Sequence, residues 1–163
     1  MERRVKPKAI VFTLGCRLNT ADSALLLSRL AGAGYEVVES AKEAALVVVN
    51  SCTVTAEAAR KSRQAVRKFR SAHPEAVIVV TGCSAELDRD AFLEDGAADV
   101  VLSNPEKRSL PELVLEYLNG KHAGLGGAEL SMLNFAKEVH SSVMSPVWKY
   151  SPARRKAAEG GLR

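Results

Sequence analysis

Short apolar runs alternate with amphipathic stretches along the first 120 residues, and this alternation restricts the fold more than any other feature of the sequence. The apolar runs are rich in valine and end at glycine, asparagine or serine, which is typical of strands buried on both faces of a sheet. They fall at residues 9–14, 35–38, 45–50, 76–81 and 99–102. Strands separated by helices favour a parallel sheet, and right-handed crossovers bring the carboxyl ends of its strands to one edge.

The stretches between these strands have the apolar periodicity of helices. The predicted helices cover residues 21–33, 56–72, 85–94 and 109–120. In the first helix, one side carries Leu26, Leu27, Leu30 and Ala31. The sequence therefore predicts a doubly wound α/β fold, with a mostly parallel sheet of about five strands and helices on both faces.

The helix predicted at residues 56–72 has the clearest two-sided pattern. Its apolar arc contains Ala58, Ser62, Ala65, Val66 and Phe69, and the opposite arc contains Arg60, Lys61, Arg63, Arg67, Lys68 and Arg70. Clustered basic side chains neutralise nucleic-acid phosphates, which makes Arg60, Arg63 and Arg67 candidate contacts. A solvated helix surface is the slightly favoured alternative, because this arc has no aromatic side chain on which a base could stack.

The composition changes after residue 120. Residues 1–120 carry 16 Lys or Arg and 16 Asp or Glu, whereas residues 121–163 carry 7 and 3, with several glycines and serines. We interpret residues 1–120 as one domain and residues 121–163 as a linker or tail, in which residues 128–139 suit a helix or a strand equally. No apolar run approaches the ~20 residues of a membrane span, and no signal peptide is recognisable, so we expect a cytoplasmic protein without membrane contact.

All three cysteines directly follow predicted strands. The segments read Thr13-Leu-Gly-Cys16-Arg-Leu-Asn19, Asn50-Ser-Cys52-Thr-Val-Thr55 and Thr81-Gly-Cys83-Ser-Ala-Glu86. An odd number of cysteines argues against a disulfide scaffold. Because the carboxyl ends of parallel strands share the edge where such folds bind ligands, the three thiols are expected to converge there.

Gly15 and Gly82 stand directly before two of these thiols, and glycine permits the close backbone approach and unusual φ values of a crowded pocket. Neighbouring helix N-termini favour thiolates and the sulfides of an iron–sulfur cluster. Zinc is an alternative metal, with His73, His122 and His140 as weak candidates for a fourth ligand. Three buried structural cysteines are the other alternative.

The three cysteine segments, with Lys61-Ser-Arg-Gln64, Asn104-Pro-Glu-Lys107 and Leu110-Pro-Glu-Leu113, resemble the N-terminal domain of the radical-SAM methylthiotransferases. The sequences of these segments look most like those of the branch that acts on threonylcarbamoyladenosine beside the anticodon of tRNA. The resemblance covers about residues 8–120.

This resemblance implies that Cys16, Cys52 and Cys83 hold an auxiliary [4Fe–4S] cluster, with Asn19 and Ser51 in its pocket beside the two glycines. Three thiolates leave one iron open. An aerobic preparation is expected to lack the cluster, because such clusters decay in air and exposed thiolates oxidise. The family's reaction inserts sulfur into an adenosine C–H bond and then methylates it.

The family's catalytic domain carries a Cys-x-x-x-Cys-x-x-Cys motif for a second [4Fe–4S] cluster that cleaves S-adenosylmethionine, and this sequence has no fourth cysteine. On this resemblance, we expect the chain to end about where the radical-SAM domain begins and to lack the RNA-binding domain. We therefore expect the chain to be inactive alone, as a truncated form or a short gene product. The alternative is a stand-alone α/β binding or scaffold module with structural or zinc-binding cysteines.

Overall fold

The computed structural model describes residues 6–15, 17–52, 55–94, 96–120 and 149–150. Its centre is a single six-stranded sheet with the order β2-β1-β3-β4-β5-β6. The strands are β1 (Lys8–Thr13), β2 (Glu36–Val37), β3 (Leu46–Ser51), β4 (Val77–Gly82), β5 (Val100–Val101) and β6 (Lys149–Tyr150). The first five are parallel, and β6 pairs antiparallel with β5.

The doubly wound α/β fold predicted from the sequence is confirmed. The helices are α1 (Arg17–Gly32), α2 (Ala56–Ala72), α3 (Cys83–Leu87), α4 (Arg89–Glu94) and α5 (Leu110–Gly120), with single 3₁₀ turns at Ala41–Glu43 and Glu106–Ser109. Helix α2 has the predicted bounds, whereas the helix expected at residues 85–94 is divided into α3 and α4. Two residues of the segment interpreted as a linker lie in the sheet as β6, and residues 128–139 lie outside the described residues.

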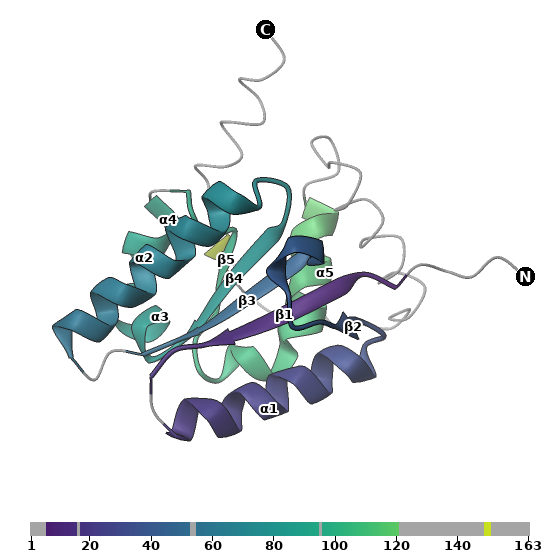
Figure 1. The fold of residues 1–163 in the computed structure, drawn as a ribbon, viewed down its shortest axis with the longest axis horizontal. Coiled ribbons are helices and arrows are strands. Elements are labelled where there is room, and N and C mark those ends of the chain that lie inside the picture. The colour runs from purple at the N-terminus through teal and green to yellow at the C-terminus, as the bar shows by residue number, and fades with distance from the viewer. Residues whose placement is uncertain (1–5, 16, 53–54, 95, 121–148, 151–163) are drawn as a thin grey trace, which may run out of the picture.

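Helices cover both faces of the sheet (Figure 1). Side chains alternate along β3, so that Leu46 and Val48 pack with α1 and α5, whereas Val47 and Val49 pack on the face covered by α2, α3 and α4. All four are fully buried. This two-sided burial is the reason why the central strands have unbroken apolar runs rather than alternating polar residues.

The buried side of α1 differs from the predicted one. Leu26 and Leu30 are buried as expected, but Ala31 is exposed and Leu27 is only partly covered. The buried row continues instead to Ser23 and Asn19, because α1 begins at Arg17 and its first turns pack against the polar ends of the strands. Within the described residues, no helix is long and apolar enough to cross a membrane.

The order of the strands creates a switch point between β1 and β3. From β1 the chain passes through α1 to β2 on one side, and from β3 it passes through α2 to β4 on the other (Figure 1). The two crossovers diverge at the carboxyl ends of β1 and β3, which is where doubly wound sheets form their ligand crevice. Cys16 follows β1 and Cys52 follows β3 in the sequence.

Candidate functional site

Two of the three cysteines lie at the ends of neighbouring strands. Ser51 and Gly82 are register partners at the end of the β3–β4 pair, and Cys52 and Cys83 are the next residues of the two chains. Neighbouring strands are about 4.8 Å apart, so the two cysteines leave the sheet side by side. Cys52 is buried and Cys83 is partly exposed, and neither forms a disulfide. Cys16 lies outside the described residues, although Gly15 and Arg17 are described.

Gly15 is in direct contact with the Cys52 side chain. A Cβ atom built on Gly15 would lie 2.3 Å from the Cβ and 2.4 Å from the Sγ of Cys52, distances that no side chain tolerates. The φ of Gly15 is +100°, in the region that favours glycine. The backbone directly before Cys16 therefore lies against the Cys52 sulfur.

Gly82 makes an equally close approach at the next strand. A Cβ atom there would lie 2.4 Å from the carbonyl oxygen of Ser51 and 2.7 Å from Oδ1 of Asn50, and the φ of Gly82 is +94°. Ser51 also joins the two strands, since its hydroxyl donates to the carbonyl of Thr81 (2.6 Å) and accepts from the N–H of Ala85 (3.3 Å). The start of α3, with Cys83 as its first residue, is thus held against the end of β3.

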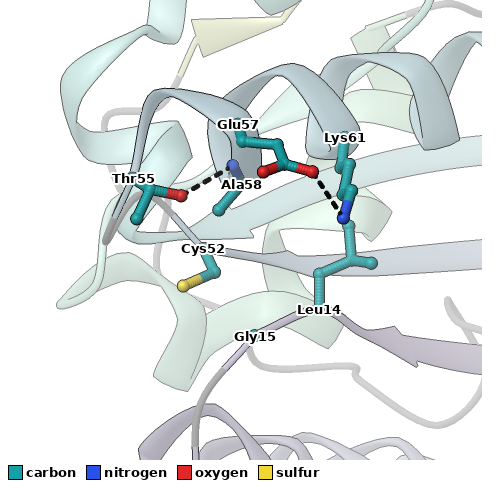
Figure 2. A pocket seen from close by; sticks show the side chains of 7 residues that line it. All are labelled: Leu14, Gly15, Cys52, Thr55, Glu57, Ala58 and Lys61. Carbon is teal, nitrogen blue, oxygen red and sulfur yellow. Dashed lines mark hydrogen bonds and ion pairs between the residues drawn. The ribbon is translucent and has the colours of Figure 1, made fainter.

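A pocket of about 290 Å³ opens between the end of β1, the end of β3 and the first turns of α2 (Figure 2). Its lining consists of Leu14, Gly15, Cys52, Thr55, Glu57, Ala58 and Lys61. Thr55 caps α2 by accepting a hydrogen bond from the Ala58 N–H (3.1 Å). Glu57 and Lys61 form an exposed ion pair of 2.9 Å, and this hydrogen bond lowers the pKa of Glu57. The pocket gives the Cys52 thiol an opening toward α2.

Two polar residues that sequence reasoning did not assign to the site hold the Cys52 loop. The hydroxyl of Ser62, in the second turn of α2, accepts from the Cys52 N–H (3.4 Å) and donates to the Cys52 carbonyl (3.3 Å). Asn50 lies fully buried at the end of the Val-rich strand β3. A serine in the apolar arc of α2 and an asparagine in an apolar strand were the available signals.

Asn19 connects the two cysteine-bearing loops. Its side-chain amide donates one hydrogen bond to the Leu14 carbonyl and one to the Ser51 carbonyl, both 2.8 Å long. These carbonyls lie at the ends of β1 and β3, 37 residues apart in sequence and on the two sides of the switch point. Asn19 therefore contributes to the geometry of the site from α1.

The described residues, which do not include Cys16, contain no group of three His, Cys, Asp or Glu side chains that could hold a metal. The residues present suit a thiolate-held group, because Cys52 and Cys83 follow adjacent strand ends and the backbone of Gly15, directly before Cys16, packs against the Cys52 side chain. His73 caps the far end of α2, roughly 25 Å from the first turn of a helix of this length. It is therefore no fourth ligand, and His122 and His140 lie outside the described residues.

Two arginines on the basic side of α2 form ion pairs with acidic residues outside the helix, which the sequence pattern did not indicate. Arg63 forms an ion pair with Asp88 (2.9 Å), and Arg70 forms one with the buried Asp99. Pattern reading missed these partners because both acids lie on other elements, more than 20 residues away in sequence. Of the three arginines predicted to contact nucleic acid, Arg60 and Arg67 are exposed and Arg63 is partly buried.

Known proteins share this domain. Residues 8–103 match the family described as "Uncharacterized protein family UPF0004". The chain is 39% identical over 106 residues to "Threonylcarbamoyladenosine tRNA methylthiotransferase MtaB" of Aquifex aeolicus, which covers 65% of this chain and 26% of the relative. The protein of the same name from Chlamydia pneumoniae is 39% identical over 105 residues, or 64% of this chain and 25% of the relative.

A relative named for another nucleoside is "tRNA-2-methylthio-N(6)-dimethylallyladenosine synthase" of Flavobacterium psychrophilum, which is 32% identical over 120 residues, or 71% of this chain and 25% of its own length. The doubly wound fold, with cysteines at the carboxyl ends of its strands, is a domain of the methylthiotransferase type. The chain belongs to the UPF0004 family, the N-terminal domain of MiaB/MtaB-type methylthiotransferases. It spans about a quarter of the length of the curated relatives.

Proposed function

We propose that residues 1–120 form the domain that binds the auxiliary [4Fe–4S] cluster of a tRNA methylthiotransferase, with Cys16, Cys52 and Cys83 as the ligands. The main support is the contact of Gly15 with the Cys52 side chain, because it brings the residue before Cys16 against the Cys52 sulfur. The register of β3 and β4 places Cys83 at the neighbouring strand end. Thiolates are the usual ligands of such clusters.

The surrounding residues would position the cysteine ligands. Gly15 and Gly82 allow the strand ends to pack closely, since a side chain on either would overlap Cys52 or Ser51, while the hydroxyls of Ser51 and Ser62 hold the backbone at Thr81 and Cys52. When bound, a cluster with three protein ligands supplies sulfur-handling chemistry at its remaining iron.

The substrate we propose for the full-length enzyme is the threonylcarbamoyladenosine of tRNA, beside the anticodon. The support is the higher identity to relatives named for that nucleoside, 39%, than to the dimethylallyladenosine synthase, 32%. S-adenosylmethionine and a second [4Fe–4S] cluster would belong to the radical-SAM domain, and an RNA-binding domain would complete the enzyme. With three cysteines in total, this chain alone is proposed not to turn over.

The test is anaerobic reconstitution of the 163-residue chain with iron and sulfide. We expect about four irons per chain and absorbance near ~400 nm for the wild type, as for a four-iron cluster. Cys16→Ala, Cys52→Ala and Cys83→Ala should each lose most of the iron, whereas His73→Ala, at the far end of α2, should bind it normally. Binding of one zinc but no iron, or no metal by a folded chain, would instead support the scaffold module.

Contact with tRNA is expected to depend on Arg60 more than on Arg63. Arg63 is held by Asp88, whereas Arg60 lies exposed on the second turn of α2. Arg60→Ala should therefore weaken binding to any tRNA and reduce the slope of log K against log salt by about one. Filter binding at several salt concentrations measures this. An equal loss in Arg63→Ala, with unchanged unfolding temperature, would contradict the assignment.

A further inference from the structure

Buried polar side chains lie directly beneath the cysteine-bearing edge, between α1 and the ends of β1 and β3. Asn19 and Ser23 come from α1 and are 2% and 5% exposed, and Asn50 comes from β3 and is fully buried. Asparagine is rarely buried so completely unless its amide is hydrogen bonded. These side chains are therefore expected to make hydrogen bonds that the structure depends on.

Each asparagine donates hydrogen bonds to the element that carries the other one. The Asn19 amide donates to the carbonyls of Leu14 and Ser51, at 2.8 Å each. The Asn50 amide donates to the Asn19 carbonyl and to the Ser23 hydroxyl, at 3.0 Å each. All four amide N–H groups are thus used. Three of the bonds join α1 to the end of β3, and the fourth joins α1 to the residue that follows β1.

The bonds also fix the direction of the Cys52 peptide group. In a planar trans peptide the carbonyl and the following N–H point in opposite directions. Because the Ser51 carbonyl points to Asn19, the Cys52 N–H points away from α1, and there it meets the Ser62 hydroxyl on α2. The backbone at Cys52 is therefore held from both faces of the sheet.

We propose that Asn19 and Asn50 act as an asparagine clamp, a pair of positioning residues that holds the loop before Cys16 and the loop at Cys52 at the spacing and orientation that a shared cluster requires. The clamp itself stands on the hydrogen bonds, and its role in cluster binding rests on the proposed function. Neither asparagine touches the cluster in this proposal.

The asparagine clamp explains why a destabilising residue is present at the end of β3. The Oδ1 atom of Asn50 is buried without a hydrogen-bond partner among the described residues, next to the backbone of Gly82. A buried acceptor that lacks a partner destabilises a fold, and an apolar residue of similar volume would avoid this. The asparagine is therefore needed for its N–H groups, which hold α1, rather than for stability at the end of β3.

The clamp is tested by hydrogen exchange of the full 163-residue chain, measured by mass spectrometry on peptides that cover residues 13–17 and 51–55. Asn19→Ala removes both bonds to the loop carbonyls, so exchange should rise about tenfold or more in both loops, as for the loss of a buried hydrogen bond. Ser23→Ala, a milder change that removes the hydrogen bonds donated to this hydroxyl by Asn50 and Thr13, should raise it by about threefold. Tyr117→Phe, which loses the hydrogen bond of 3.1 Å to Asp99, is the matched control and should leave both loops unchanged.

Reconstitution of the same variants with iron and sulfide connects the clamp to the cluster. Asn19→Ala should retain its circular dichroism spectrum but bind less than half of the wild-type iron, with a broadened electron paramagnetic resonance signal after reduction. Faster exchange in one loop only, or in neither, would overturn the clamp. Faster exchange in both loops with normal iron binding would overturn its role in positioning. If the wild type binds no iron while the exchange result holds, the proposed function fails and the clamp stands.

Discussion

Replacing Gly82 by alanine is expected to lower the free energy of unfolding by about 2–4 kcal/mol, since backbone strain costs about 1–3 kcal/mol and overpacking adds a similar amount. The φ of +94° is strained for alanine, and its Cβ would lie 2.4 Å from the Ser51 carbonyl oxygen and 2.9 Å from the Ser51 nitrogen. Ser51 cannot move aside easily, because it is paired in the centre of the sheet. Urea unfolding of the metal-free chain followed by circular dichroism measures the change.

Gly32→Ala is the matched control for Gly82→Ala. Gly32 ends α1 without a positive φ, and a Cβ built on it would have no neighbour within 4 Å. Alanine there should leave the stability unchanged or raise it by up to about 1 kcal/mol, because alanine is the better helix former. If the two substitutions destabilised the chain equally, the close approach of β3 to Gly82 would not be the reason why glycine is required at position 82.

The sequence alone is sufficient to predict the layers of this fold. The valine-rich runs that became β3 and β4 are buried on both faces, and that burial is what an unbroken apolar run reports. The bounds of α2 follow from a strong apolar arc with Thr55 as its N-cap. The edge that carries the cysteines then follows from the handedness of the crossovers alone.

The polar part of the site could not be predicted in the same way. Apolar periodicity reports which side of an element is buried, and it assigned Ala31 to the buried side of α1 because Ala31 is apolar and lies one turn after Leu27, whereas the true buried row includes the polar Asn19 and Ser23. The bond from Asn19 to the Ser51 carbonyl spans 32 positions, and the ion pair of Arg63 with Asp88 spans 25. Such contacts depend on how crossovers bring loops together, so no local pattern encodes them.

Asp99→Ala is expected to destabilise the chain by about 3–5 kcal/mol, the range seen when one partner of a buried ion pair is removed. The Asp99 carboxylate is fully buried and accepts hydrogen bonds from the Ile78 N–H (2.8 Å), the Tyr117 hydroxyl (3.1 Å) and the Arg70 guanidinium. Alanine would leave these donors without their acceptor, and Arg70, whose side chain is 18% exposed, without this counter-ion. Urea unfolding again provides the measurement.

The comparison for Asp99→Ala is Glu57→Ala, which removes an exposed ion pair with Lys61 and should change stability by at most about 0.5 kcal/mol. A similarly small effect of Asp99→Ala would mean that Arg70 finds other acceptors, such as the backbone carbonyls that it already binds. The Asp99 carboxylate accepts a hydrogen bond from Ile78 near the start of β4, whereas Cys83 follows the opposite end of that strand. The folded fraction of Asp99→Ala should therefore still bind iron in the wild-type ratio, which separates global stability from the geometry of the cysteine-bearing edge.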